Sequence, residues 1–330
     1  MMNKLNLALI GAGQLGSRHL QGLSKLKGNN SIYILDPSYN SLSISEKRLG
    51  EVSVKNLKNS YYFLNDYSKL PNFIDLAIVA TNSDVRKDVV GKLIDVTKTK
   101  NFILEKFLFQ KEEDFWEVDE LFKKNEISVW VNCTRRMYPE FIKLKLLLKG
   151  SKINEVNVRG SNWALGSNAI HYIDIIAFLI DNSEYVIKKN FLINEIFVNK
   201  RLGFIDFNGT INGEFANGTV FKISSHPTGT CELEIEFFLD DRVIIIKENE
   251  QKLLMQHKVG NTWQIIEEAF PTYYQSNLSN IAVEKIMSEG TSDLTPYSES
   301  MKLHLPLLKL FQDHYQKLQN KNENILCPIT

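Results

Sequence analysis

The sequence predicts an α/β protein of two domains, an N-terminal doubly wound parallel sheet and a C-terminal α+β domain with a large, mostly antiparallel sheet. Three observations predict this architecture. Up to residue 132, short apolar strands alternate with amphipathic helices, which is typical of a parallel sheet covered on both faces. A glycine-rich turn follows the first strand. From residue 186 onward, strands of alternating polarity follow one another with Asn-Gly turns between them, as in an antiparallel sheet.

Length and composition fit a two-domain globular protein. The chain has 330 residues, of which 43% are hydrophobic and 24% charged. This length exceeds that of a typical single domain. We therefore expect one domain over residues 1–132 and a second over residues 133–330. The last predicted helix, 297–318, is a candidate to pack back on the first domain.

Charge and cysteine content exclude several classes of protein. The 39 basic residues balance 39 acidic ones, so neither a nucleic acid nor an anionic membrane is an expected partner. No apolar run approaches the roughly 20 residues that a membrane span needs. Three cysteines without a CxxC motif predict neither a disulfide framework nor a zinc site, and the histidines do not cluster, so we expect a cytoplasmic protein without a metal.

The elements of the first domain follow from local patterns. Strands are expected at 5–10, 32–35, 61–64, 74–80, 102–104 and 127–131, and helices at 14–27, 83–96 and 112–124. The segment 74–80 is apolar at nearly every position, as a strand buried on both faces should be. Helix 112–124 carries acidic residues in its first turn and lysines in its last, which matches the helix dipole.

The second domain begins with helices and continues as a meander. Helices are expected at 140–149 and 169–180, a strand at 155–158, further strands between 186 and 266, and helices at 273–287 and 297–318. Glycine after asparagine at 209, 213 and 218 can adopt positive φ, which marks turns between the strands. An antiparallel sheet with one uncovered face predicts a homodimer or homotetramer through this sheet.

The glycine-rich turn fits the dinucleotide-binding motif G-x-G-x-x-G. It consists of Gly11, Ala12, Gly13, Gln14, Leu15 and Gly16. Gly11 permits the tight turn, Gly13 lets the backbone approach a diphosphate, and Gly16 lets the helix pack closely on the strand. Because the motif follows a strand and opens a helix, we expect a Rossmann domain whose helix N-terminus binds the diphosphate. The alternative is a glycine turn without a ligand.

Two further positions are expected to contact the cofactor. Asp36 ends the second strand, twenty residues after Gly16 (36 − 16), where an acid binds the adenosine ribose. A carboxylate there repels a 2′-phosphate, and no Arg or Lys occurs in 37–40, so NAD(H) is preferred over NADP(H). Thr81 and Asn82 follow the fourth strand and either flank the cofactor or form an ordinary strand-to-helix cap.

Several segments together resemble one oxidoreductase family. They are the glycine turn, IDLAIVAT at 74–81, Glu105-Lys106 after the fifth strand, RMYP at 136–139 and GSNAIHYID at 166–174. With these segments the chain resembles the Gfo/Idh/MocA family, which includes glucose–fructose oxidoreductase and inositol dehydrogenase. The resemblance covers most of the chain.

The resemblance implies roles for particular residues. Lys106 would lie near the nicotinamide and polarise the substrate oxygen, with Glu105 beside the cofactor. His171 would be the general acid/base, and Asp174, three residues along the same helix face, would orient it or bind substrate. Without the resemblance, a lysine at a strand end is usually a solvated charge and a histidine on an apolar helix a packing residue.

Two positions depart from the family pattern. Phe107 replaces the family's proline after the lysine, which leaves the turn freer and allows the ring to pack against the cofactor. Ser167 stands where many members carry an Asp, and a hydroxyl cannot supply a carboxylate charge. Four residues are weaker candidates for substrate contact: Arg136, Trp163, Ser167 and Asn168.

The expected function is hydride transfer between NAD(H) and a hydroxyl or keto carbon of a sugar or nucleotide sugar, with surface-glycan biosynthesis as one setting. One alternative is a redox-neutral sugar-modifying enzyme that retains its NAD. A second is a catalytically inactive NAD(H)-binding regulator or scaffold, which the departures at Phe107 and Ser167 favour.

Overall fold

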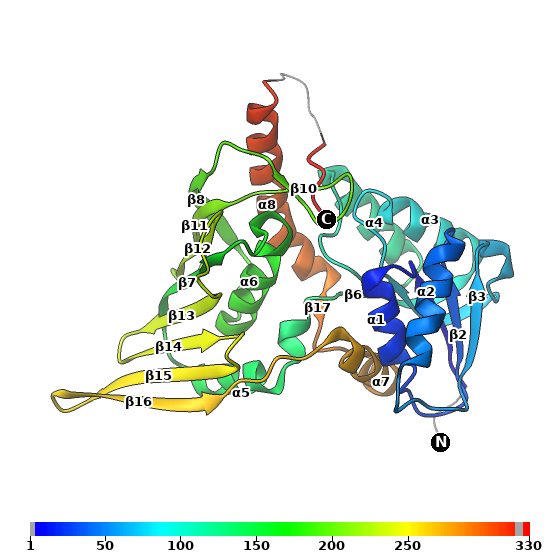
Figure 1. Cartoon of the computed structure of the whole chain (residues 1–330), viewed down its shortest axis with the longest axis horizontal. Coiled ribbons are helices and arrows are strands. Elements are labelled where there is room, and N and C mark those ends of the chain that lie inside the picture. The colour runs from blue at the N-terminus through cyan, green and yellow to red at the C-terminus, as the bar shows by residue number, and fades with distance from the viewer. Residues whose placement is uncertain (1–3, 321–325) are drawn as a thin grey trace. The chain divides into compact units, whose positions relative to one another are not determined.

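A computed structural model describes residues 4–320 and 326–330 (Figure 1). The chain forms two compact units. Unit 1 comprises Met1–Thr134, Tyr273–Ser298 and Thr330, and unit 2 comprises Arg135–Thr272 and Glu299–Ile329. The boundary expected at 132/133 lies two residues before the end of the first segment of unit 1 (134 − 132). Unit 1 also takes a later segment, 273–298, that the sequence analysis assigned to the second domain.

Unit 1 contains the predicted parallel sheet, which confirms the Rossmann architecture. Its strand order is β17-β6-β5-β4-β1-β2-β3. The strands are β1 (Asn6–Ile10), β2 (Ser31–Leu35), β3 (Ser60–Leu64), β4 (Phe73–Val79), β5 (Lys98–Leu104), β6 (Ser128–Val131) and β17 (Thr295–Pro296). All pair in parallel except β17, which is antiparallel to β6. The chain changes direction across the sheet between β1 and β4, where ligands of such sheets bind.

Helices cover the parallel sheet. They are α1 (Gln14–Leu23), α2 (Tyr39–Gly50), α3 (Arg86–Val96), α4 (Glu112–Lys124) and α7 (Ser279–Glu289), with short 3-10 turns η1 (Tyr67–Lys69) and η3 (Gln275–Asn277). The sequence analysis did not predict α2, because this serine-rich helix buries only Leu42, Ser45 and Leu49. Helix α7 packs on α1, and this contact brings the 273–298 segment into unit 1.

Unit 2 is built on the predicted large sheet, whose order is β16-β15-β14-β13-β7-β12-β11-β8. The strands are β7 (Ile153–Ser161), β8 (Tyr185–Leu192), β11 (Gly209–Phe215), β12 (Val220–His226), β13 (Glu234–Leu239), β14 (Arg242–Lys247), β15 (Lys252–Val259) and β16 (Thr262–Ala269). Neighbours are antiparallel except β7 and β12, which run parallel. A separate hairpin pairs β9 (Phe197–Val198) with β10 (Ile205–Asp206).

Helices pack on one face of this sheet, as the alternating burial of its strands requires. They are α5 (Pro139–Leu148), α6 (Leu165–Ile180) and α8 (Tyr297–Leu318), with α5 preceded by η2 (Thr134–Met137). Helix α6 is apolar on nearly all sides and lies largely buried along the sheet (Figure 1). Helix α8, a candidate to pack on the first domain, belongs from Glu299 onward to unit 2. No helix in the described part of the chain has the length and apolarity to cross a membrane.

Candidate cofactor and substrate sites

The glycine turn connects β1 to α1 at the carboxyl edge of the parallel sheet. Gly11 has φ +95°, and its N–H donates to the Leu35 carbonyl at 2.8 Å. A Cβ atom on Gly16 would lie 1.9 Å from the Gly11 carbonyl oxygen, whereas one on Gly13 would meet nothing within 4 Å. Thus Gly11 and Gly16 permit the fold, while Gly13 leaves space open at the helix start. No side chain caps α1, and its first turn carries no acid, which leaves N–H groups for an anion.

Asp36 lies against this turn. One carboxylate oxygen accepts from Ala12 N–H at 2.7 Å and the other from Ser38 N–H at 2.8 Å. Each oxygen can accept a second hydrogen bond, so binding of ribose hydroxyls remains possible. The sequence analysis missed Arg48, twelve residues after Asp36 (48 − 36). Its guanidinium donates to Gln14 Oε1 at 2.7 Å and Ser17 Oγ at 2.6 Å, so a cation does lie beside the start of α1.

The ends of β4 and β5 carry the other predicted cofactor residues. Thr81 and Asn82 follow β4, with Asn82 exposed, and Glu105 and Lys106 follow β5. The Lys106 side chain is partly exposed, whereas Glu105 is 3% exposed. The peptide bond between Lys106 and Phe107 is cis. The Phe107 ring, for which packing against the cofactor was one option, is fully buried.

Glu105 is the centre of a buried polar cluster that the sequence analysis did not find. Its carboxylate accepts from His19 Nε2 at 2.8 Å and from Asn132 Nδ2 at 2.5 Å. The other nitrogen of His19 contacts Ser279 Oγ at 2.9 Å, and Asn132 Nδ2 also donates to Gln275 Oε1 at 2.8 Å. His19 is 1% exposed and holds Glu105 in place.

The Glu105 carboxyl is ionised despite its burial. Burial raises its pKa, but hydrogen bonding from His19, the charges of His19 and Arg86 and a hydrogen bond from Asn132 outweigh this effect. The resulting pKa lies below the ordinary value of 4.5. Lys106, whose side chain bears an ammonium group, therefore directly follows a residue that carries a fixed negative charge.

His171 lies on α6 in unit 2 with a partly exposed side chain. Asp174, its predicted partner, is fully buried and forms an ion pair with Arg136, whose Nε lies 2.8 Å from Asp174 Oδ2. Arg136 also contacts Glu299 at 2.8 Å. These charges face one another inside unit 2. Lys106 lies in unit 1 and His171 in unit 2, so their action on one substrate stays a prediction.

Ser167 is joined to a carboxylate that comes from elsewhere in the chain. Its Oγ donates to Asp206 Oδ2 at 2.6 Å, and Gly166 N–H donates to Asp206 Oδ1 at 2.7 Å. Asn199 Nδ2 donates to Ser167 Oγ at 2.9 Å. Asp206, on β10, thus caps the N-terminus of the helix that carries His171. Burial raises the pKa of Asp206, although the hydrogen bonds from Ser167, Phe207 and Gly166 oppose this effect.

Trp163 lies on the loop before α6, in contact with a second ionic cluster. Its ring meets Tyr172 edge-on at 5.2 Å, and its Nε1 donates to the Ser224 carbonyl at 2.8 Å. Asn168 Nδ2 donates to the Trp163 carbonyl at 2.8 Å. Arg135 binds Glu248 through two hydrogen bonds of 2.7 Å and Tyr172 through one of 2.9 Å. No sequence pattern indicated the contact between Arg135 and Glu248, because the two residues are 113 positions apart and meet only in the folded protein.

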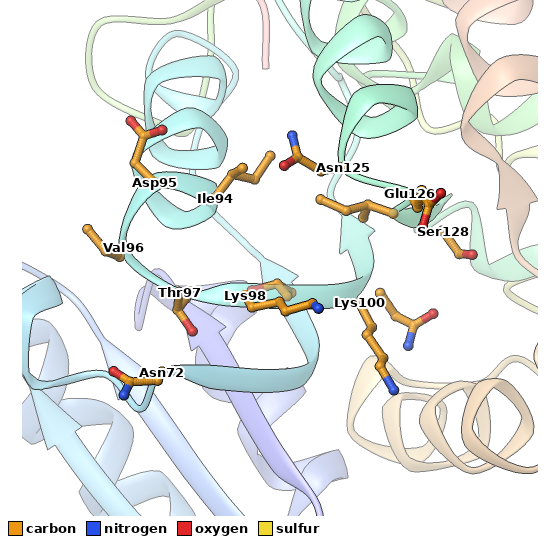
Figure 2. A pocket seen from close by; sticks show the side chains of 13 residues that line it. Asn72, Ile94, Asp95, Val96, Thr97, Lys98, Lys100, Asn125, Glu126 and Ser128 are labelled. Atoms are coloured by element: carbon orange, nitrogen blue, oxygen red, sulfur yellow. The ribbon is translucent and has the colours of Figure 1, made fainter.

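A pocket of about 640 Å³ in unit 1 lies away from the glycine turn (Figure 2). Its walls come from the end of α3, the start of β5 and the segment between α4 and β6, and include Asp95, Lys98, Asn125 and Glu126. This is the amino edge of the parallel strands, whereas the glycine turn lies at their carboxyl edge. The pocket is therefore separate from the candidate cofactor site. Within the described ranges, no three His, Cys, Asp or Glu side chains are arranged to hold a metal ion.

Comparison with known proteins identifies the family of the first domain. Residues 5–133 match the Gfo/Idh/MocA family, described as an oxidoreductase family with an NAD-binding Rossmann fold. This match confirms the resemblance predicted from the sequence motifs. No curated protein sequence matches the chain.

Solved structures share the fold along nearly the whole chain. A super-repressor mutant of Gal80p from Saccharomyces cerevisiae has a TM-score of 0.73 and 12% identity, over 96% of this chain and 97% of that chain. UDP-N-acetylglucosamine 3-dehydrogenase from Acidithiobacillus ferrooxidans has a TM-score of 0.68 and 12% identity, over 94% and 97%. A mutant 3-ketoreductase from Actinomadura kijaniata, in complex with TDP-benzene and NADP, has a TM-score of 0.69 and 8% identity, over 92% and 96%.

A pair of glycine substitutions separates folding from cofactor binding. We expect Gly16→Ala to lower the free energy of unfolding by about 1–3 kcal/mol or more, because its Cβ atom collides with backbone. Gly13→Ala has room for its methyl group, so stability should change by less than about 0.5 kcal/mol while NADH binding weakens. Denaturant unfolding and NADH fluorescence titration measure the two effects. Equal stability of both variants would contradict the argument.

The Glu105 cluster predicts a pH-dependent stability. Glu105→Gln should lower the free energy of unfolding by about 1–3 kcal/mol at pH 7, because an amide replaces a buried carboxylate that accepts hydrogen bonds from His19 and Asn132. The folded-state pKa of Glu105 is lowered, so this contribution is present above the ordinary pKa of 4.5 and is lost as the pH falls through the folded-state pKa. Urea unfolding at several pH values tests this, with the exposed Glu117→Gln as control. A difference between wild type and Glu105→Gln that persists at the lowest pH would refute it.

Proposed function

We propose that this chain, whose first domain matches the Gfo/Idh/MocA oxidoreductases, transfers a hydride between NAD(H) and a hydroxyl or keto carbon of a sugar or nucleotide sugar. One observation carries the proposal. The open start of α1 and the turn after β5 that carries Lys106 lie at the same carboxyl edge of one parallel sheet, and the buried, ionised Glu105 directly precedes Lys106 in the chain. A diphosphate at the first and a reacting oxygen at the second suit an oxidoreductase.

The residues at this edge fit a dinucleotide. Gly11–Gly16 would hold the diphosphate, Asp36 the adenosine ribose, and Thr81 and Asn82 would flank the nicotinamide. The bound cofactor supplies a nicotinamide carbon that accepts or donates the hydride. We prefer NAD(H) because the Asp36 carboxylate repels a 2′-phosphate and the Arg48 guanidinium is already engaged by Gln14 and Ser17. Weaker binding of NADPH than of NADH is therefore expected in titrations.

Lys106 and His171 are the proposed catalytic residues. The ammonium group of Lys106 would donate a hydrogen bond to the substrate oxygen and stabilise the negative charge that develops there. The imidazole of His171 would accept or return the hydroxyl proton. Asp174 would act indirectly, because its ion pair with Arg136 fixes α6 and so the direction of His171. Trp163 and Asn168 are better substrate candidates than Arg136 and Ser167, because their side chains are partly exposed whereas those of Arg136 and Ser167 are buried.

The comparisons support the proposed substrate class and one of the alternatives. The likeness in fold to a UDP-N-acetylglucosamine dehydrogenase and to a 3-ketoreductase supports a nucleotide-sugar substrate, as in surface-glycan biosynthesis in the cytoplasm. A redox-neutral reaction with retained NAD uses the same residues. The likeness to a Gal80p super-repressor supports a second candidate, an NAD(H)-binding regulator without turnover.

Substitution of Lys106 tests the proposed chemistry. Lys106→Met should lower turnover by roughly 10²–10³-fold, because a donor to the developing oxyanion is lost, and leave NADH affinity nearly unchanged. Calorimetry with NADH and NADPH measures binding, and absorbance of NADH measures turnover with a panel of nucleotide sugars that includes UDP-N-acetylglucosamine. Unchanged turnover in Lys106→Met would remove Lys106 from the mechanism. Cofactor binding by wild type without turnover across the panel would favour the regulator.

We also propose a homodimer or homotetramer formed through the sheet of unit 2. Every residue of edge strand β16 is exposed, including Trp263 at 61% and Ile265 at 64%. An exposed apolar strand of this kind is usually covered by a partner. Trp263→Glu with Ile265→Lys should produce monomers in light scattering, whereas Tyr274→Lys, at an exposed position of unit 1, should not. A monomeric wild-type protein would exclude the assembly.

A further inference from the structure

A single buried guanidinium connects the ends of two neighbouring strands. Arg86 is the first residue of α3 and has no exposed surface. Its Nη1 donates to the carbonyl oxygens of Phe107 and, at 2.7 Å, Leu108, and its Nη2 donates to the carbonyl oxygen of Thr81. Thr81 follows β4, and Phe107 and Leu108 follow β5, so one side chain holds both turns at the carboxyl edge of the sheet.

The stability of α3 does not explain an arginine at this position. A cation at a helix N-terminus opposes the helix dipole, and burial of a charge is costly without partners. The partners of Arg86 include backbone carbonyls outside the helix and the charge of Glu105, whose pKa it helps to lower. The position of the guanidinium is therefore explained by the two turns that it connects. The planar fork of arginine suits this task, because it donates in several directions at once.

We propose that Arg86 is a positioning residue that fixes Lys106 and the Thr81–Asn82 turn toward the nicotinamide. The inference rests on the proposed function, because it assumes that NAD(H) lies at this edge. Arg86 touches neither substrate nor cofactor in this assignment. It binds the carbonyl oxygen of Phe107, the residue after Lys106, and the carbonyl oxygen of Thr81, the residue before Asn82. By fixing these two backbone groups it sets the direction of both side chains. Misplacement of a catalytic group by about 1 Å is enough to reduce a reaction rate severely.

Lysine NMR tests the inference without knowledge of the substrate. The protein is reductively methylated with ¹³C, the Lys106 signal is assigned from its absence in Lys106→Arg, and NADH is added. In wild type, NADH should shift the Lys106 signal. In Arg86→Gln this shift should fall to less than about a third of its wild-type size. NADH affinity should weaken by less than about tenfold, because the glycine turn still binds the diphosphate.

Matched variants separate positioning from simple stabilisation. Lys87→Gln, one residue along α3 in an outward ion pair with Asp114 and Glu117, should keep the wild-type shift. Arg86→Lys retains the charge but not the fork and should give an intermediate shift. This variant decides the question if Arg86→Gln does not fold. A wild-type Lys106 shift in folded Arg86→Lys or Arg86→Gln overturns the inference, even where the melting temperature falls. Absence of NADH binding in wild type instead overturns the proposed function.

Discussion

The buried carboxylate of Glu105 is the interaction on which the candidate cofactor site depends. A carboxylate that is 3% exposed is stable as an ion only if hydrogen-bond donors and positive charge surround it. Its partners come from α1, from the end of β6 and, through Ser279 and Gln275, from a segment more than 140 residues later. The same ion therefore fixes the helix that follows the glycine turn, the turn after β5 that carries Lys106, and the returning segment of unit 1.

A second buried carboxylate has the same role in unit 2. Asp206 accepts hydrogen bonds from Gly166 and Ser167 and so caps the helix that carries His171. The N–H groups at a helix start need acceptors, and a carboxylate also suits the positive end of the helix dipole. In both units, then, the proposed catalytic side chain itself is partly exposed, while a neighbouring buried carboxyl group fixes the backbone that carries it.

Local patterns predicted most of the fold, because each strand and helix carries its own periodicity. The run of apolar residues in β4 and the glycine turn before α1 are such signals. The serine-rich α2 lacked one. The partners of Arg48, Arg86 and Asp206 were beyond prediction for a different reason. The two guanidinium groups meet their acceptors, and the Asp206 carboxyl group meets its donors, only through tertiary contacts. The sequence showed the Rossmann turn, Lys106 and His171, whose roles stay predictions, but not the ions that hold the surrounding backbone.

Tertiary contacts compensate for part of what is lost at the two departures from the family pattern, Ser167 and Phe107. Ser167 lacks a carboxyl group, but its hydroxyl donates to the carboxyl group of Asp206, so a carboxyl group is still present at the start of α6. Phe107 lacks the fixed φ of proline, but its carbonyl is held by the guanidinium of Arg86, which restricts the same turn from outside. A buried arginine whose carbonyl partners lie on the turns beside Lys106 and Asn82 fits the proposed enzyme, in which both of these side chains need a fixed direction.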